Sequence, residues 1–280
     1  MICFPNCKIN LGLYVTNKRS DGYHDLETVF YPLSVVAAND NYLPLRDVLE
    51  IVPADEAKLT LSGLAVAGNN NDNLVWKAYQ LLRSEFPGKV PALDIYLHKV
   101  IPMGAGLGGG SADGSFMLKL INDYCNLGLS AAMLATCALK LGSDCPIFIY
   151  NTPMFATGRG EQLAHAAVDL SGFSIQIICP KVHVSTAKAF SSLSPRAASF
   201  DLRTLHQLPV ADWKEKVAND FETTVFRQHA VLGEIKEQLY THGALYASMS
   251  GTGSAIYGIF RKSGRAQIVV NTPFEDYYIK

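Results

Sequence analysis

Residues 101–116 read IPMGAGLGGGSADGSF, and five of the seven positions from 104 to 110 are glycine. Glycine loses more conformational freedom on folding than any other residue, so such a run is costly unless the backbone must approach something closely. A strand-like segment, residues 92–101, precedes the run, and a helical pattern follows it. Glycine-rich amides and the positive end of a helix dipole bind anions together. The stretch therefore predicts a phosphate site, with its helix beginning near Ser111 or Ala112.

Two common phosphate-binding motifs do not fit this loop. Gly104, Gly106 and Gly109 match G-x-G-x-x-G, but a dinucleotide-binding unit needs a second parallel strand after the first helix, and here a second helical pattern follows. A Walker loop needs Gly-Lys-Ser/Thr, whereas Gly110-Ser111 is followed by Ala-Asp. A flexible surface loop remains the alternative to a phosphate site. For Ser111, capping the helix is the alternative to contacting a phosphate or its metal ion.

Composition limits the classes of protein. A chain of 280 residues, 49% of them hydrophobic, is long enough for two domains. The formal net charge of -1 provides no overall attraction to nucleic acid or an anionic membrane. The apolar windows are far shorter than the roughly 20 residues that span a bilayer, and the N-terminus MICFPNCK has no secretory pattern. We expect a cytoplasmic protein that binds neither nucleic acid nor membrane.

Cysteines and histidines give no metal-binding pattern. The six cysteines form no CxxC pair, and the seven histidines form no HExxH motif. Reduced thiols in a cytosol fit this usage best, with a metal site at Cys3 and Cys7 as the alternative to their being small buried hydrophobes. No protein metal site is predicted.

Strand and helix patterns in the first half predict a mixed fold. Residues 7–15 and 26–36 read as the strands of a β-hairpin around an Asp-Gly turn signal. Residues 72–86 carry apolar side chains at helical spacing, with Asp72 or Asn73 as the N-cap. After the glycine run, two helical patterns follow one another without a strand between them.

The second half again mixes strands and helices. Residues 173–180 read as a strand, 204–238 as mostly helical, and 245–260 as a strand, a glycine-rich turn and a strand. We expect a domain boundary near residue 160.

Four segments resemble blocks of one kinase superfamily. Residues 102–111 resemble the ATP loop of the superfamily that includes galactokinase, homoserine kinase, mevalonate kinase and phosphomevalonate kinase (GHMP). Residues 5–30, 141–161 and 250–260 are similar to further blocks, in the family order and over almost the whole chain. These three segments narrow the resemblance to the branch that acts on an alcohol linked to cytidine diphosphate.

The resemblance implies a two-domain α+β GHMP kinase fold with its active site in the cleft between the domains. Residues 1–160 would form the N-terminal ATP-binding kinase domain, like ribosomal S5 domain 2, and residues 161–280 a ferredoxin-like C-terminal GHMP-type substrate domain. The implied reaction is phosphorylation of the 2-hydroxyl of 4-diphosphocytidyl-2-C-methyl-D-erythritol in non-mevalonate isoprenoid precursor biosynthesis. ATP and Mg²⁺ would take part, and the enzyme would be a monomer or weak homodimer. The alternatives are another GHMP small-molecule kinase, of mevalonate or sugar type, and a non-catalytic nucleotide-binding relative.

The resemblance also assigns the catalytic and nucleotide-binding residues. Asp144 would accept the proton of the substrate hydroxyl, and Lys8 would lie beside that carboxylate and the transferring phosphoryl group. An opposite charge within about 4–6 Å lowers a carboxylate pKa, so such an aspartate stays charged. A weak base is sufficient for phosphoryl transfer, because the loose transition state of this reaction depends mainly on positioning and charge stabilisation. The residues expected to contact the nucleotide are Asn73, Lys99, Pro102, Gly104, Gly106, Leu107, Gly108, Gly109, Gly110 and Ser111.

The expected substrate contacts come from both halves of the chain. The resemblance places Asn10 near the reacting hydroxyl, and Tyr23, His24 and Phe190 around the cytosine. An aromatic pair can sandwich a pyrimidine, although a phenylalanine such as Phe190, taken singly, is more often a packing residue. Residues 251–254 would complete the cleft, with a plain hairpin turn as the alternative.

Overall fold

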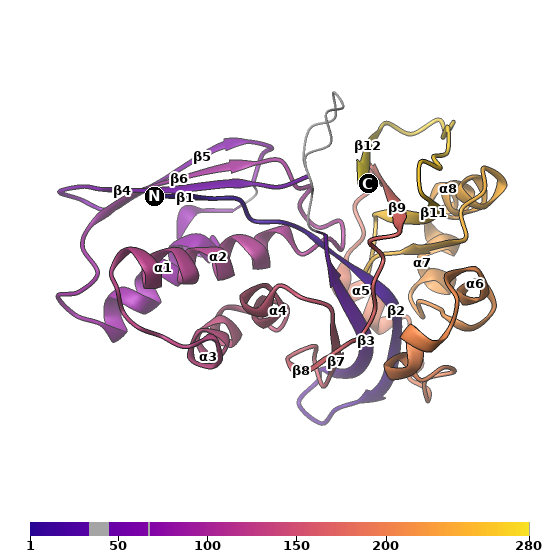
Figure 1. The fold of residues 1–280 in the computed structure, drawn as a ribbon, viewed down its shortest axis with the longest axis horizontal. Coiled ribbons are helices and arrows are strands. Elements are labelled where there is room, and N and C mark those ends of the chain that lie inside the picture. Colours follow the sequence, from indigo (N-terminus) through magenta and orange to yellow (C-terminus); the bar gives the residue numbers. More distant parts are fainter. Residues whose placement is uncertain (34–44, 67, 280) are drawn as a thin grey trace. The chain divides into compact units, whose positions relative to one another are not determined.

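The computed structural model describes residues 1–33, 45–66 and 68–279 of the chain. Its helices and strands form two compact units (Figure 1). The first consists of the described residues within 1–7, 45–103 and 108–152, and the second of those within 8–44, 104–107 and 153–280. The chain therefore passes between the units several times. The predicted division into 1–160 and 161–280 stays a prediction.

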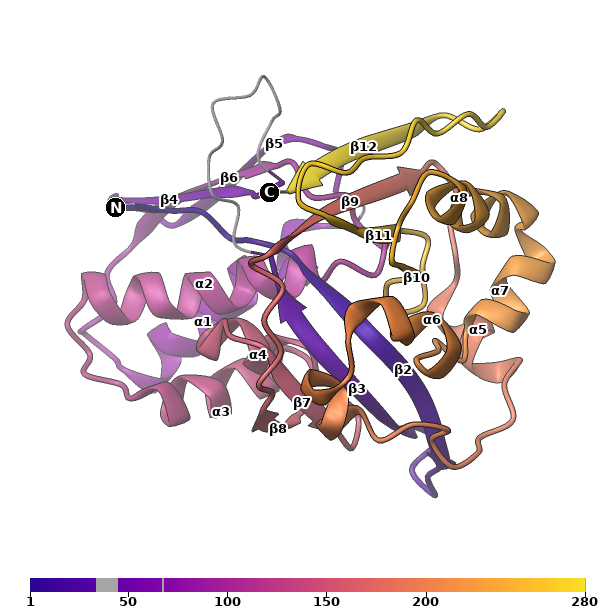
Figure 2. The same cartoon turned by 45° about the vertical axis from the view of Figure 1, so that its right-hand side comes forward.

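A four-stranded sheet and the helices on one of its faces form the first unit (Figure 2). The strand order is β1-β4-β6-β5, and the β5–β6 pair is parallel whereas the other two pairs are antiparallel. Buried side chains of the sheet and of α1 to α4 share one hydrophobic core. The elements are β1 (Ile2–Cys3), β4 (Val48–Pro53), β5 (Lys58–Gly63), η1 (Asn70–Asp72), α1 (Leu74–Glu85), β6 (Leu93–Lys99), α2 (Gly109–Tyr124), α3 (Ala131–Leu141) and α4 (Cys145–Tyr150).

Strand β6 shows why this sheet delivers a charged residue into the interior. Leu93, Ile95 and Leu97 are buried and alternate with less buried residues, because successive side chains of a strand point to opposite faces. Lys99 continues the alternation and is buried as well. The strand predicted before the glycine run is confirmed, and so are the predicted helix at α1 and the two successive helices α2 and α3.

An antiparallel sheet in the order β2-β3-β7-β8 belongs to the second unit. Strands β2 and β3 form the predicted hairpin, and residues 34–36 of its predicted second strand lie outside the described residues. The register of the pair shifts between Leu11 and Leu13, where Gly12 has a positive φ of 72°. The strands are β2 (Lys8–Lys18), β3 (His24–Pro32), β7 (Met154–Thr157) and β8 (Gln162–His165).

A second antiparallel sheet of this unit has the order β10-β11-β9-β12. Helix α8 packs on β10 and β11, and its buried side chains share a core with those of β9 and β11. The strand predicted at 173–180, the helical stretch and the strand–turn–strand at 245–260 are confirmed. The elements are β9 (Phe173–Pro180), α5 (Thr186–Ser191), η2 (Leu202–Gln207), η3 (Val210–Asp212), α6 (Trp213–Lys216), α7 (Glu222–Gln228), α8 (Ala230–Thr241), β10 (Tyr246–Met249), β11 (Ile256–Arg261) and β12 (Phe274–Ile279).

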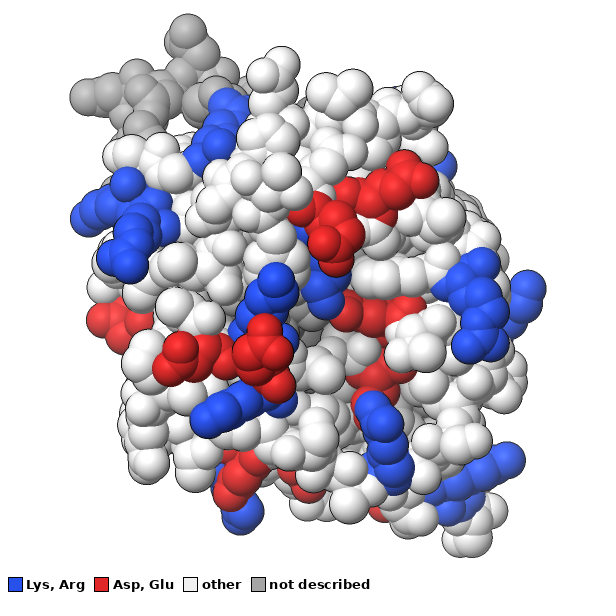
Figure 3. Space-filling model, turned by 90° about the vertical axis from the view of Figure 1, so that its right-hand side faces the viewer, with Lys and Arg blue, Asp and Glu red and all other residues white. Residues whose placement is uncertain are grey.

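Charged side chains of both signs are interspersed over the face shown in Figure 3. Within the described residues, no helix combines the length and the apolar character needed to cross a membrane.

Candidate active site

The glycine run alternates between left-handed and ordinary backbone before the helix starts. Gly104, Gly106 and Gly108 have φ of 69°, 79° and 73°, a region that glycine enters without the steric penalty of a Cβ. Helix α2 begins at Gly109 with Gly108 as its N-cap and no side-chain cap. The predicted helix start at Ser111 or Ala112 is therefore wrong by at least two residues, and Ser111 is not the N-cap. The left-handed Gly108 turns the chain directly into the helix, so no side chain is needed there.

Residues 104–107 are held by backbone and side-chain groups of the second unit. The carbonyl of Gly106 accepts hydrogen bonds from Lys8 Nζ (3.0 Å) and Ser250 Oγ (2.8 Å). The buried Leu107 accepts at its carbonyl from Lys8 N (2.9 Å), and Ala105 accepts from Ala255 N (3.0 Å). A Cβ added to Gly106 would lie 1.9 Å from Ser250 O, so this position requires glycine.

Lys8 and Asn10 lie side by side on β2 because residues two apart share one face of a strand. Both are almost fully buried. Lys8 Nζ donates to Asn10 Oδ1 (2.6 Å) and lies 5.0 Å from the ring centroid of Phe30. Asn10 Nδ2 donates to Thr28 Oγ1 (2.9 Å) on the neighbouring strand β3. The predicted catalytic lysine is thus fixed next to the predicted substrate-binding asparagine and to the glycine loop.

Lys99 is the centre of a buried charged cluster in the first unit. Its Nζ forms ion pairs with Asp47 and, at 2.6 Å, with Asp113 Oδ2. Asp47 Oδ1 also accepts from the amides of Val100 (2.6 Å) and Ile101 (2.9 Å), which fixes the entry to the glycine loop. Burial raises the pKa of Asp113 well above its usual range, and the Asp47 carboxylate adds to this, while Lys99 opposes it. Asp113 Oδ1 has no hydrogen-bond partner within the described part of the chain.

A cavity of about 140 Å³ opens beside this cluster. Asn73, Lys99 and Gly110, three of the residues predicted to contact the nucleotide, line it together with Asn69 and Asp113. Asn73 is the N-cap of α1, and its Oδ1 accepts from Val75 N (2.9 Å). Two of the other predicted nucleotide contacts, Pro102 and Gly104, lie at the start of the loop, on the chain segment that leads into it.

Asp144 is a half-buried residue at the N-cap position of α4 and makes no side-chain cap hydrogen bond. Ser115 Oγ on α2 donates to Cys145 O (2.7 Å) and to Ser111 O (2.8 Å). These bonds fix the start of α4 to the first turns of α2. The structure thereby brings Asp144 and Ser111 into the same region of the first unit, whereas Lys8 belongs to the second.

The residues predicted around the cytosine divide into two contacts within the second unit. The His24 and Phe190 rings stack with centroids 5.1 Å apart and an interplanar angle of 26°. Phe190 also meets Phe221 edge-on at 4.8 Å. Tyr23 is 54% exposed, and the Arg159 guanidinium lies 4.1 Å from its ring centroid. The structure thus brings His24 and Phe190 together and places Tyr23 against a cation that the sequence reasoning did not select.

Other groups of the site were also missed from the sequence. Asp47 precedes an alternating strand and belongs to no recognisable motif. Asp113 is an acidic residue among the small and apolar residues at the start of a helix, and this contrast could have identified Asp113 from the sequence. Ser250 lies at the edge of the glycine-rich turn between β10 and β11, and the predicted cleft residues 251–254 form that turn. The role of an isolated polar residue such as Asp47 can be recognised only when the fold shows which group it contacts.

Comparisons with known proteins identify the family of the chain. The model "GHMP kinases N terminal domain" matches residues 73–152 and "GHMP kinases C terminal" matches residues 204–278. Proteins named 4-diphosphocytidyl-2-C-methyl-D-erythritol kinase are similar to the chain: that of Parabacteroides distasonis is 48% identical over 94% of this chain and 92% of its own, and that of Bacteroides thetaiotaomicron is 49% identical over 94% and 93%.

Solved structures give the same result. A crystal structure of 4-(cytidine 5'-diphospho)-2C-methyl-D-erythritol kinase matches with a TM-score of 0.76 and 28% identity, over 92% of this chain and 90% of that one. Homoserine kinase from Cytophaga hutchinsonii matches with a TM-score of 0.63 at 17% identity, over 98% and 94%, which shows the shared fold.

The fold and the glycine loop define a small-molecule kinase of the GHMP type, with the predicted α+β two-domain fold, and ATP is the co-substrate that this class implies. Within that class, the chain belongs to the family of 4-diphosphocytidyl-2-C-methyl-D-erythritol kinases. The predicted family and enzyme class are confirmed.

Proposed function

We propose that this enzyme transfers the γ-phosphoryl group of ATP to the 2-hydroxyl of 4-diphosphocytidyl-2-C-methyl-D-erythritol in non-mevalonate isoprenoid precursor biosynthesis. The observation that carries the proposal is the 48–49% identity, over more than nine tenths of both chains, to kinases with this substrate in their names. A mevalonate- or sugar-type kinase would share the fold and the loop, but solved mevalonate kinases are far less similar in sequence, at 11–14% identity.

In the proposed mechanism, Asp144 accepts the proton of the attacking hydroxyl and Lys8 stabilises charge on the transferring phosphoryl group. Asn10, which shares a hydrogen bond with Lys8, orients the substrate near that hydroxyl. The transition state of phosphoryl transfer is loose, so accurate placement of these groups matters more than the strength of the base. Burial supports the role of Lys8, because a positive charge acts more strongly where water is excluded.

The ATP phosphates would bind the amides of Gly106, Leu107, Gly108, Gly109 and Gly110, with the N-terminus of α2 adding its dipole. The left-handed glycines support this, since a chain of alternating conformation turns successive N–H groups into one concavity. The nucleoside would occupy the cavity that Asn73 and Lys99 line, with Pro102 and Gly104 at the loop entry.

Mg²⁺ fits the site as an ion carried by the nucleotide. This cation keeps several waters and is usually bound by one or two protein groups plus substrate phosphates. The described residues contain no group of three or more His, Cys, Asp and Glu side chains that could form a protein cage for it. The Ser111 hydroxyl in the first turn of α2 is a suitable oxygen donor, and the ion would neutralise charge on the phosphates.

Tyr23, His24 and Phe190 would form the cytosine pocket. The His24–Phe190 stack brings two of the three residues together, and the cytosine would stack on an outer ring face, since the two rings already cover each other's inner faces. The Arg159 guanidinium on the Tyr23 ring would hold that exposed side chain in one orientation.

We also propose that residues 1–160 act as the ATP-binding domain and 161–280 as the substrate domain, since the two family matches lie within these ranges. The enzyme would work in the cytoplasm as a monomer or weak homodimer, with a small-molecule substrate and without nucleic acid or membrane. The net charge of -1 supports the absence of nucleic acid and membrane, because it provides no overall attraction to either.

A coupled assay with cytidyl and uridyl substrates tests the function and the pocket together. Truncating Tyr23→Ala should raise KM for the cytidyl substrate about 5- to 150-fold, the range for loss of one base-stacking contact, and leave KM for ATP unchanged. The uridyl analogue should be a poor substrate, because a pocket that pairs with one base edge leaves its groups unpaired against the other.

Tyr96→Ala, which removes another exposed tyrosine from strand β6, is the matched control and should behave as wild type. Equal kcat/KM for cytidyl and uridyl substrates, or for a polyol without a nucleotide, would contradict the proposed function.

A further inference from the structure

The short segment from Ala218 to Phe221 lies between α6 and α7 and forms hydrogen bonds with strand β2 and with the turn between β10 and β11. We propose that Asn219 in this segment is a positioning residue for catalysis, which holds the turn between β10 and β11 in the place where that turn receives residues 104–107. The inference rests on the proposed roles of Lys8 and of the glycine loop.

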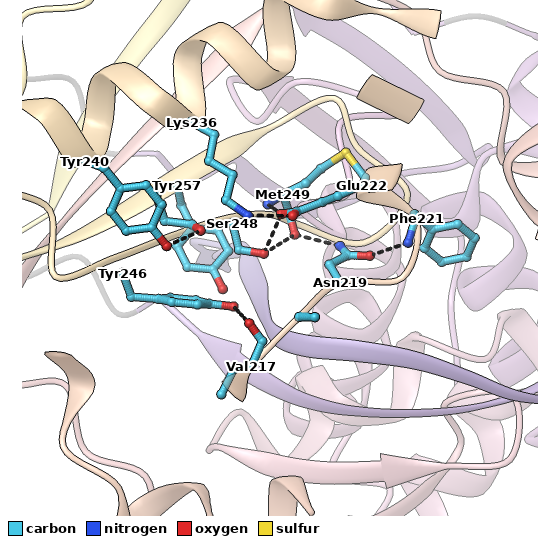
Figure 4. Close-up of polar contacts among 12 residues, drawn as sticks. Val217, Asn219, Phe221, Glu222, Lys236, Tyr240, Tyr246, Ser248, Met249 and Tyr257 are labelled. Carbon is cyan, nitrogen blue, oxygen red and sulfur yellow. Dashed lines mark hydrogen bonds and ion pairs between the residues drawn. The ribbon is translucent and has the colours of Figure 1, made fainter. Parts of the chain in front are cut away.

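Asn219 uses all the hydrogen-bonding groups of its side chain. Its Nδ2 donates to Met249 O and to Gly251 O, both at 2.8 Å. Its Oδ1 accepts from Phe221 N at 3.0 Å (Figure 4). The side chain is buried, so water cannot substitute for a lost donor without reorganisation. The carbonyls on both sides of Ser250 are therefore fixed by one amide group.

The turn held in this way is in direct contact with the glycine loop. Ser250, between the two carbonyls, donates its hydroxyl to Gly106 O at 2.8 Å. Gly106 lies so close to the turn that a Cβ would come within 1.9 Å of Ser250 O. A displacement of the turn by a fraction of an ångström therefore moves Gly106, whose carbonyl also accepts from Lys8 Nζ.

The same segment is paired with the strand that carries Lys8. Leu13 N donates to Ala218 O and Asp220 N donates to Leu13 O, both at 2.9 Å. Val15 N donates to Asp220 Oδ2 at 2.9 Å. Strand β2 and the turn are thus both positioned from one segment, which sets the distance between Lys8 and the loop.

Glu222 supports the turn from the side of β10. Its Oε1 accepts from Met249 N (2.8 Å) and Ser248 Oγ (2.9 Å), and its Oε2 accepts from Lys236 Nζ (2.5 Å) (Figure 4). Through this ion pair, α7 and α8 fix the end of β10. Asn219, in contrast, donates to the carbonyls of the residues on both sides of Ser250.

The substitution Asn219→Asp tests the donor alone. Aspartate keeps the shape and the acceptor for Phe221 N, but it places an oxygen opposite the carbonyls of Met249 and Gly251. We expect the turn to move away and kcat to fall by about tenfold or more, because small misplacements of reacting groups are costly. KM for ATP should rise about fivefold or more, whereas KM for the cytidyl substrate should stay unchanged.

Ser174→Ala is the matched control. The Ser174 hydroxyl is buried in the same unit and also donates to two carbonyls, those of Arg261 (3.2 Å) and Gly264 (3.1 Å), away from the turn. Both variants should lower Tm, but Ser174→Ala should keep wild-type kcat and KM values. A purely structural loss reduces the fraction of active enzyme and leaves KM for ATP unchanged, so this KM separates the two roles.

The proposal is overturned if Asn219→Asp keeps the wild-type KM for ATP and differs from Ser174→Ala in neither kinetic constant. Lys8→Ala is measured in parallel as a test of the proposed function. Wild-type turnover in Lys8→Ala would show that the proposed mechanism fails, whatever Asn219 does. Should Asn219→Asp not fold, Asn219→Ser gives the same test without a charge, because serine is too short to reach both carbonyls. Wild-type kinetics in Asn219→Ser would equally overturn the inference.

Discussion

Lys99, at the scale of single residues, is one almost fully buried cation between two almost fully buried carboxylates. One ammonium group cannot fully compensate two buried carboxylates, so this cluster favours the neutral form of a carboxyl. Asp113 shows this effect, since burial raises its pKa and its Oδ1 has no hydrogen-bond partner among the described residues.

Replacing Asp113→Asn should make the protein less sensitive to pH. Folding raises the Asp113 pKa above its ordinary value of 3.8, so between that value and the folded pKa the native state binds more protons than the unfolded state. The free energy of unfolding of the wild type therefore falls as pH rises through this window. Asparagine has no such proton, so the variant should gain stability relative to the wild type as pH rises above about 3.8.

Urea unfolding at several pH values measures this difference. Asp55→Asn, which removes an exposed carboxylate, is the control for the change in net charge. The raised pKa of Asp113 would be contradicted if the difference in free energy of unfolding between wild type and Asp113→Asn were constant with pH or changed in the opposite direction.

Asp144→Asn should lower kcat by at least about a hundredfold, the range for a lost proton acceptor. The variant should still fold, because asparagine has nearly the same shape as aspartate, and circular dichroism checks this. Asp212→Asn is the matched control, since Asp212 is also an N-cap residue without a side-chain cap bond. Steady-state kinetics on the purified variants measure kcat. Wild-type kcat in Asp144→Asn would show that Asp144 is not the proton acceptor.

Among the elements, the glycine loop contains glycines that share one backbone conformation but differ in how closely other segments pack against them. Gly104 and Gly106 both have positive φ, so alanine at either should cost roughly 1–2 kcal/mol of backbone strain. Around Gly104 no atom lies within 4 Å of an added Cβ, whereas at Gly106 the Cβ would meet Ser250 O. Only the second substitution forces two segments apart.

Gly106→Ala should therefore weaken ATP binding by about tenfold or more, since it displaces the amides that we propose bind the phosphates, while Gly104→Ala should bind ATP within about threefold of wild type. Calorimetric titration with ATP measures both affinities, and circular dichroism checks that the variants fold. Equal affinities in the two variants would show that the contact with Ser250 does not shape the loop.

The elements also show how far sequence reasoning reaches. Local patterns identified β6, α1 and the β10–β11 hairpin, because alternation and helical spacing are encoded by neighbouring residues. They misplaced the start of α2, where a left-handed Gly108 replaces the expected side-chain cap. They also missed the partners of Lys99 and of Gly106, because Asp47 and Ser250 come from distant segments whose approach only the fold determines.

At the scale of the whole molecule, each compact unit has its own hydrophobic core. Charges of both signs are mixed over the surface in Figure 3, and the net charge is -1. A net charge this small gives little mutual repulsion between copies of the chain. All residues proposed for catalysis and binding come from a single chain.

Activity per chain should therefore stay constant when the enzyme is diluted about a thousandfold, because a site made by one chain does not depend on association by mass action. Initial rates at saturating ATP and cytidyl substrate measure this, with an inert carrier protein added to prevent loss on surfaces. Sedimentation velocity at the highest and lowest concentrations should be run alongside. A weak homodimer would change the sedimentation coefficient but not the activity, whereas activity that falls with dilution would mean that a second copy completes the site.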